Sequence, residues 1–264
     1  MNGQSPGLRG KNAVVFDASY DLGPHYVRGL LERGARVWAL GADPGRLGVL
    51  EGLERLVSVP LVDSRPESLA TAAAAAASSA GKVDILIHND KRSAHPNLAT
   101  EDYENSDWHE TFDRNIHSAF YLTKALLSVM KTGAGGSMLF VSTSSTKVTL
   151  LGPHLRVAAA YEAANAALNR FARRLAAELG PFGINVNALC VGNVEKEAIA
   201  SLARQLADQA GVSPQAIISE ILARQKMDGF IPIDHVVAQL CHLVSPVSRY
   251  LTGQEVMLSG GMDL

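Results

Sequence analysis

Short apolar runs alternate with longer segments of helical periodicity along this chain of 264 residues. The first run, Ala13–Phe16, is rich in branched residues and predicts a buried strand. Gly23-Pro24 then opens a helix that runs through Arg33, because proline is favoured in the first turn of a helix. Further strands are expected at Arg36–Leu40, Leu56–Val62, Val83–Ile87, Met138–Val141, Ile184–Ala188 and Glu255–Leu258.

The segments between these strands are predicted to be helical. They are Pro44–Glu54, Ser64–Ala80, Asn115–Lys131, Ala158–Leu179, Pro232–Val244 and Ile199–Lys226. The last segment is expected to form one or two helices, with Ser213-Pro214 as cap and first turn. Continuous apolar strands that alternate with helices are typical of a parallel sheet covered on both faces. We therefore predict a single doubly wound, Rossmann-like α/β domain over residues 1–264, with about seven parallel strands, a flexible N-terminus at residues 1–10 and a substrate lid at about residues 192–230.

Composition narrows the class of protein. The chain is 47% hydrophobic and 19% charged, which excludes global disorder. A formal net charge of -2 gives no reason to expect a nucleic acid or an anionic membrane as partner. Cys190 and Cys241 lack the spacing of a metal site or a disulfide framework, and two thiols fit a reducing compartment. The N-terminus is polar and no apolar run is long enough to span a membrane, so we expect a cytoplasmic protein without a metal.

The loop after the first strand is the first candidate for binding chemistry, because ligands of doubly wound sheets bind at the carboxyl ends of the strands. It reads FDASYDLG from Phe16 to Gly23. Two carboxylates, Asp17 and Asp21, stand where a nucleotide-binding loop would be rich in glycine, and they would repel a phosphate. An alternative is that one or both aspartates cap the helix that opens at Gly23. Both interpretations remain open at this point.

From Lys11 to Leu264 the sequence resembles the short-chain dehydrogenase/reductase superfamily. Asp63 matches the acidic residue that the family uses near adenine, and Asn115 matches the family's active-site asparagine. Tyr161 lies in the segment that corresponds to the family's YxxxK, within AAAYEAANAALNRFARRLAAELG. The stretch YLTGQ from Tyr250, followed by Gly260-Gly261, matches the end of the family pattern.

The sequence departs from the family at each segment that contacts the cofactor. The family's TGxxxGxG loop keeps only Gly23, and its NNAG becomes His88-Asn89-Asp90-Lys91. Lysine of YxxxK becomes Asn165, and a threonine after the sixth strand becomes Lys196. The degenerate cofactor positions are Asp17, Asp21, Gly23, Asp63, Asn89 and Lys91. These losses predict a protein without a nicotinamide cofactor, and a pair between Lys91 and Asp17 or Asp21 would fill the pyrophosphate space.

The resemblance makes Tyr161 the candidate for proton transfer. Asn165 carries no charge, so an unassisted phenol of pKa about 10 is a poor base but a usable acid. One cation among Arg156, Lys147 and Lys196 would restore a lower pKa. The other candidate catalytic residues are Thr143 and Ser144, which would hold a substrate oxygen, together with Ser142, Asn115 and Asn165. The alternatives are a structural Tyr161, a hydroxyl cluster that bonds the turn backbone, and Asn115 as a helix N-cap.

Three functions follow. The first is a non-redox enzyme that uses a tyrosine and a hydroxyl for elimination, cyclisation, epimerisation or dehalogenation of a small organic molecule. Halohydrin dehalogenases are a precedent that the chain resembles at Asn89-Asp90 and YLTGQ, although they carry arginine at Asn165. The second is an NAD(P)-dependent ketoreductase, and the third is a catalytically silent binding or assembly protein. The resemblance also implies a homodimer or homotetramer. We expect His88 and His154 to be structural.

Overall fold

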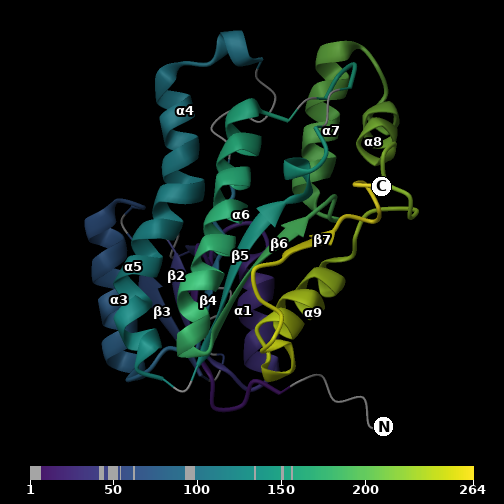
Figure 1. Ribbon diagram of the computed structural model, residues 1–264. Coiled ribbons are helices and arrows are strands. Elements are labelled where there is room, and N and C mark those ends of the chain that lie inside the picture. Colours follow the sequence, from purple (N-terminus) through teal and green to yellow (C-terminus); the bar gives the residue numbers. More distant parts are fainter. Residues whose placement is uncertain are drawn as a thin grey trace, which may run out of the picture.

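The computed structural model describes residues 7–41, 45–46, 53, 55–61, 63–92, 99–133, 135–149, 152–155 and 157–264. Within these residues seven strands form one parallel sheet in the order β3-β2-β1-β4-β5-β6-β7 (Figure 1). The strands are β1 (Asn12–Phe16), β2 (Arg36–Gly41), β3 (Leu56–Pro60), β4 (Ile85–His88), β5 (Gly136–Thr143), β6 (Ile184–Val191) and β7 (Glu255–Leu258). The predicted sheet is confirmed.

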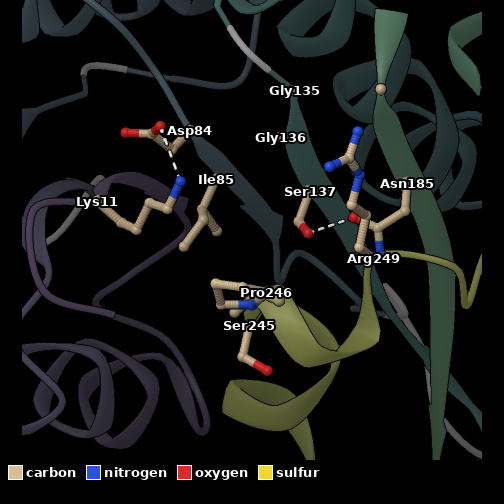
Figure 2. A pocket seen from close by; sticks show the side chains of 12 residues that line it. Lys11, Asp84, Ile85, Gly135, Gly136, Ser137, Asn185, Ser245, Pro246 and Arg249 are labelled. Atoms are coloured by element: carbon tan, nitrogen blue, oxygen red, sulfur yellow. Dashed lines mark hydrogen bonds and ion pairs between the residues drawn. The ribbon is translucent and has the colours of Figure 1, made fainter. Parts of the chain in front are cut away.

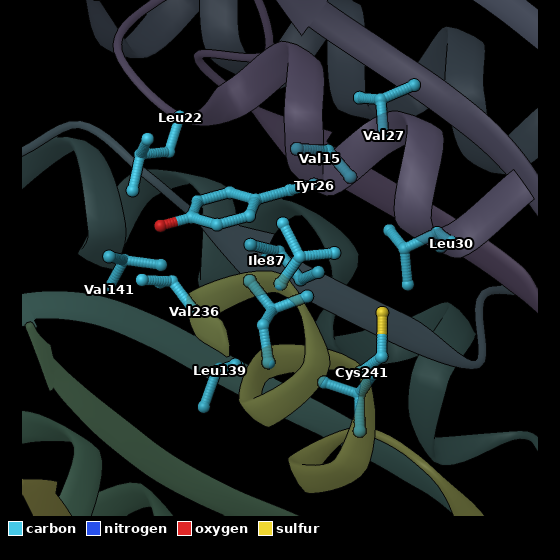
Figure 3. Packing of buried hydrophobic residues seen from close by; sticks show 14 of the residues in the cluster. Val15, Leu22, Tyr26, Val27, Leu30, Ile87, Leu139, Val141, Val236 and Cys241 are labelled. Carbon is cyan, nitrogen blue, oxygen red and sulfur yellow. The ribbon is translucent and has the colours of Figure 1, made fainter. Parts of the chain in front are cut away.

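The apolar runs form strands because both faces of the sheet are covered. Successive side chains of a strand point to opposite faces. Ala13 and Val15 of β1 therefore belong to the core beneath α1 (Gly23–Glu32) and α9 (Ile233–Leu243), which Figure 3 shows around Tyr26. Val14 and Phe16 belong to the core on the other face, which is covered by α3 (Pro66–Ala80), α5 (Ser118–Lys131) and α6 (Ala159–Leu179). Each strand must consequently be apolar at every position. A sheet with one face in water would instead need apolar and polar residues to alternate along each strand.

The helices agree with the predicted pattern in most places. They are α1 (Gly23–Glu32), α3 (Pro66–Ala80), α4 (Asn105–Phe112), α5 (Ser118–Lys131), α6 (Ala159–Leu179), α7 (Glu197–Ala210), α8 (Pro214–Leu222) and α9 (Ile233–Leu243). Short 3-10 turns occupy Thr100–Asp102, Ser144–Thr146, Gly180–Phe182 and Pro246–Ser248. The expected helix Pro44–Glu54 lies mostly outside the described residues, as does the greater part of the expected flexible N-terminus.

The structure adds one helix that was not expected, and it divides one predicted segment into two helices, as the pattern allowed. The sequence pattern gave no sign of α4, because its eight residues contain a single buried side chain, Thr111. The segment expected as one or two helices at Ile199–Lys226 is two helices, separated by Gly211 in the left-handed region at φ 67°. Ser213 caps α8 by accepting a hydrogen bond from the Ala216 N–H.

Asn115 does not begin a helix. It lies in a turn of π-helix, Asp113–His117, which joins α4 to α5 in one continuous helical stretch. The N-cap interpretation of Asn115 is therefore wrong. Single π turns inside helices occur frequently at functional sites, since the extra residue redirects one side chain.

The chain order places a topological switch point between β1 and β4. From β1 the chain builds outward through β2 and β3, and then returns to form β4 on the other side of β1. The carboxyl ends of these two strands are where a doubly wound sheet binds ligands. In Figure 1, α7 and α8 lie beyond the carboxyl ends of β5 and β6, and they pack around their own apolar cluster. No helix among the described residues is long and apolar enough to cross a membrane.

Candidate functional site

The loop between β1 and α1 carries two aspartates with left-handed backbone conformation. The φ angle is 56° for Asp17 and 51° for Asp21. Glycine adopts this region at no cost, and aspartate adopts it more readily than most other residues. Gly23 is required by close packing, since a Cβ there would lie 2.7 Å from the carbonyl oxygens of Asp17 and Ala18. The tight turn therefore persists although two of the family's glycines are replaced.

Neither aspartate caps α1. The N-cap residue of this helix is Leu22, and no side chain bonds to the first helical N–H groups. The capping interpretation is wrong because each carboxylate is paired with a cation from a segment that follows another strand. Asp17 Oδ2 lies 2.7 Å from Arg92, and Asp21 Oδ1 lies 2.6 Å from Lys196 Nζ.

Arg92 joins Asp17 to a second buried carboxylate. Its Nε donates to Asp90 Oδ1 at 2.8 Å, and its guanidinium lies 4.3 Å from the centre of the Tyr20 ring. Burial and the neighbouring Asp90 raise the pKa of Asp17 to about 7, although Arg92 acts in the opposite direction. Burial also raises the pKa of Asp90. The sequence reasoning missed Arg92, which stands directly after Lys91 in the same loop.

Two lysines converge on Asp21. Lys91 Nζ lies 3.8 Å from Asp21 Oδ2, which is one of the two pairings that the sequence allowed, and Lys196 completes the group. Burial opposes ionisation of Asp21, but Lys91 and Lys196 outweigh this effect and lower its pKa. Burial also lowers the pKa of Lys91 to about 8. The three side chains come from the carboxyl ends of β1, β4 and β6.

Tyr161 lies in the first turn of α6 and meets Thr143 at the end of β5. Burial raises the pKa of Tyr161, and a hydrogen bond with the Thr143 hydroxyl opposes part of this effect. Thr143 also accepts from the Ser145 N–H at 3.2 Å, so the turn at the end of β5 holds its hydroxyl in place. The structure thus brings together two of the candidate catalytic residues.

The other two hydroxyls of this candidate set lie apart from that pair. Ser144 Oγ contacts the Met262 sulfur at 3.9 Å, near the C-terminus. Ser142 is fully buried and stands in register with Cys190 of β6. Because neighbouring residues of a strand point to opposite faces, Ser142 and Thr143 do not share one cleft.

Asn165 is buried and bonded to Asn115. Its Nδ2 donates to Asn115 Oδ1 at 2.9 Å and to the Tyr161 carbonyl at 3.0 Å. Asn115 in turn donates to the Arg92 carbonyl at 2.5 Å. These bonds form a neutral bridge from the tyrosine's helix to the loop that carries Arg92. The π turn is what directs Asn115 toward this bridge.

Two of the three cations suggested for Tyr161 are engaged elsewhere. Lys147 Nζ pairs with Glu255 at 2.9 Å, and Lys196 pairs with Asp21. Arg156 lies outside the described residues. A high pKa for Tyr161 is therefore consistent with its surroundings.

Both histidines have structural partners. His88 Nε2 lies 2.8 Å from Ser118 Oγ, and burial lowers the pKa of His88 to about 3, which keeps it neutral. His154 Nδ1 lies 2.9 Å from Glu220 Oε2, and Glu220 also accepts from two backbone N–H groups. This second pair ties the segment after β5 to α8, within the predicted lid.

Asn89 and Asp63 border the same edge of the sheet. Asn89 Nδ2 donates to the carbonyl oxygens of Asp17 and Tyr20, at 3.2 and 2.9 Å, and so supports the loop after β1. Asp63 accepts from Arg65 Nε at 2.6 Å. Asp63 lines a cavity of about 590 Å³, whose wall also contains Phe16, Asp17, Leu61, Ser64, Arg65, Pro66, Arg92, Glu110, Asp113, Arg114 and Tyr121.

A second cavity, of about 160 Å³, lies at the opposite edge of the sheet, where the strands begin. Figure 2 shows Lys11 pointing to Asp84 on one side of this cavity. Lys82 also pairs with Asp84, at 3.1 Å. Ser137 and Asn185 are bonded to each other on the other side. The larger cavity is the better candidate site, since it lies next to the switch point between β1 and β4.

Comparison with known proteins finds that the chain is similar to reductases and oxidoreductases. A family model described as enoyl-(acyl carrier protein) reductase matches residues 19–263. The chain is 28% identical to the oxidoreductase UcpA of Escherichia coli strain K12, over 97% of its own length and 96% of the relative. It is also 28% identical, over 95% of its length and 96% of the relative, to a Streptomyces coelicolor protein whose name assigns it, provisionally, as a ketoacyl reductase. Among solved structures, the Pseudomonas aeruginosa RhlG/NADP active-site complex is similar with a TM-score of 0.84 and 26% identity, covering 98% of each chain.

These relatives contradict two predictions from the sequence. The family model and one relative are named as reductases and the other relative as an oxidoreductase, so the non-redox function expected first is wrong. The expectation of no nicotinamide cofactor is contradicted as well, because RhlG is known in complex with NADP. The loss of two loop glycines therefore does not exclude a nicotinamide cofactor. Asp17 and Asp21 keep the left-handed backbone of those positions, and three cations stand beside them.

The extent of the match decides the family. The family model matches residues 19–263, and the two relatives cover 97% and 95% of the chain. The chain therefore belongs to the short-chain dehydrogenase/reductase superfamily.

Proposed function

We propose that this protein is an NAD(P)-dependent reductase that acts on the carbonyl group of a small organic molecule, with a ketoacyl compound as the first candidate. The observation that carries the proposal is the pair formed by Tyr161 and Thr143 at the carboxyl end of β5. The family and the ketoacyl reductase relative support the redox chemistry.

The residues present fit a nicotinamide nucleotide in two respects. The cavity of about 590 Å³ beside Asp63 lies where the family binds adenosine, and Arg65 and Arg92 line it. The loop after β1 leaves the first N–H groups of α1 without a side-chain cap, and a helix N-terminus favours a phosphate. Asp17 and Asp21 oppose an anion there, but Arg92, Lys91 and Lys196 balance their charge.

The bound nucleotide would supply a hydride to the carbonyl carbon. Tyr161 would then give its phenolic proton to the oxygen on which negative charge develops. A raised pKa keeps this phenol protonated at neutral pH, which suits an acid and makes it a poor base. Thr143 would orient the phenol through their hydrogen bond, and α7 and α8 would exclude water as a lid over residues 192–230.

Purified protein mixed with NADPH or NADH and a panel of small ketones and β-ketoacyl thioesters tests the proposal. We expect loss of the absorbance of the reduced nicotinamide with at least one ketone, and binding of one nucleotide by calorimetry. Absence of binding of both nucleotides at millimolar concentration, together with no turnover, would overturn it.

Three further expectations belong to this proposal. We expect one domain, because one sheet and its two covering layers include every described strand. Both cysteines are free and buried, which agrees with a cytoplasmic protein. The exposed aromatic residues Trp108 and Phe120 on the α4–α5 side support a homodimer or homotetramer.

A further inference from the structure

Asp21 occupies an unusual electrostatic position at the switch-point edge. Its side chain is 11% exposed and has two lysines around it, Lys196 at 2.6 Å and Lys91 at 3.8 Å. Two ammonium groups thus meet one carboxylate, whereas Asp17 and Asp90 beside it share the single guanidinium of Arg92. The Lys91 side chain is only 9% exposed. An ammonium group that is buried to this extent needs an anion close to it, and Asp21 is the carboxylate that its Nζ meets.

The backbone around Asp21 is arranged for a ligand with phosphate groups. Asp21 has the left-handed φ of 51° that suits glycine, and it directly precedes the uncapped N-terminus of α1. In a glycine-rich loop this position would leave space for a pyrophosphate. Here the Asp21 carboxylate occupies the space beside the two lysines. Like a phosphate, it presents negatively charged oxygens to them.

We propose that the Asp21 carboxylate stands in for a nucleotide phosphate, and that Lys91 and Lys196 are the side chains that bind this phosphate when the nucleotide enters. This inference rests on the proposed nicotinamide-dependent function and names the residues that recognise its phosphates. Binding then exchanges one anion for another on the same two lysines. The ammonium groups of the two lysines would then bind the phosphate in place of some of the backbone N–H groups that bind it in a glycine-rich loop.

A consequence is that Asp21 competes with the nucleotide. If the lysines are free of Asp21 in only about a tenth of the molecules, the apparent affinity is reduced about tenfold. The variant Asp21→Asn removes the competing charge and keeps the shape of the side chain, and asparagine also tolerates the left-handed backbone. We expect it to bind NADPH, NADH and inorganic pyrophosphate about tenfold more tightly than the unmodified protein.

Asp84 provides a matched control. It also lies between two lysines, Lys11 at 3.5 Å and Lys82 at 3.1 Å, but at the opposite edge of the sheet (Figure 2). Asp84→Asn should leave all three dissociation constants unchanged. A general effect of net charge would shift them equally in both variants and would overturn the proposal.

Isothermal titration calorimetry with the three probes decides between the outcomes. Tighter binding by Asp21→Asn alone, and weaker binding by Lys196→Met, support the exchange. If the unmodified protein binds a nucleotide and Asp21→Asn binds it equally well or more weakly, the exchange is wrong while the proposed function stands. If no variant binds any nucleotide, both fail. Should Asp21→Asn not fold, Lys196→Met decides alone, since unchanged affinity in that variant overturns the role of the lysine.

Discussion

At the scale of single residues, the chemistry of this edge depends on which cation each aspartate meets. Asp17 shares Arg92 with Asp90, so one guanidinium serves two buried carboxylates. Asp21 has two lysines to itself. The same residue type in one loop therefore has its pKa raised at Asp17 and lowered at Asp21. Local charge balance, and not residue type, sets the protonation state.

The raised pKa of Asp17 predicts a pH dependence of stability. In the folded protein this carboxyl titrates near pH 7, whereas the unfolded chain releases the proton near pH 4. The folded state holds the extra proton between these values, so the stability contributed by this group falls as pH rises from about 4 to 7. The melting temperature of Asp17→Asn relative to that of the unmodified protein should therefore rise as the pH increases from about 4 to 7. Above about pH 7 this difference in melting temperature should stay constant. A difference in melting temperature that stays constant from pH 4 to 8 would contradict this.

Tyr161→Phe tests the proposed acid. We expect kcat for ketone reduction to fall by about 10²- to 10⁴-fold, since general acid catalysis typically contributes that much. Affinity for NADPH, measured by calorimetry, should not change, because the variant keeps the ring and removes only the hydroxyl. Tyr250→Phe is the control, as Tyr250 is 93% exposed at the far end of the chain. Full activity of the Tyr161 variant would remove this residue from the mechanism.

At the scale of elements, the termini of strands and helices position the site. β5 ends at Thr143 and α6 begins at Ala159, so the proton donor and its partner stand at two adjoining element ends. The π turn at Asp113–His117 directs Asn115 to Asn165 and to the Arg92 carbonyl. The loop after β1 depends on Gly23 for its close approach to α1.

Gly23→Ala should destabilise the protein. A Cβ at this position would lie 2.7 Å from two backbone carbonyl oxygens, which cannot move as a flexible side chain can. We expect a loss of about 1–3 kcal/mol in the free energy of unfolding, typical of overpacking, from urea titration. Gly180→Ala is the matched control, because a Cβ there meets nothing within 4 Å. Equal stability of both variants would show that the loop relaxes freely.

At the scale of the whole molecule, the α4–α5 side presents apolar surface. Phe120 is 46% exposed and its ring lies 6.4 Å from that of Phe171 on α6. Exposed aromatic groups on neighbouring helices are typical of a protein interface.

We expect size-exclusion chromatography with light scattering to give a dimer or tetramer for the unmodified protein and a smaller species for Phe120→Glu. Phe182→Glu serves as control, since Phe182 is comparably exposed at 42% but lies in the turn after α6. A monomeric unmodified protein would contradict the proposed assembly.

The sequence by itself determined the sheet, most of the helices and the segments that form the site. It could do so because strands buried on both faces require continuous apolar runs, and because Pro and Gly mark where helices begin and end. α4 escaped detection because only Thr111 of its eight residues is buried. Tyr161 and Thr143 were identified from the resemblance to the family, and they meet because the end of β5 adjoins the start of α6.

Only the tertiary structure decided the electrostatics of the site. Asp21, Lys91 and Lys196 come from three strand ends, and Arg92 reaches Asp17 across 75 positions of sequence. No local pattern encodes such pairs, because they depend on how the sheet aligns its carboxyl edge. The sequence showed that two glycines had become aspartates. The fold showed that those aspartates keep the left-handed backbone and that nearby cations balance them, which is why their presence does not by itself exclude a nucleotide.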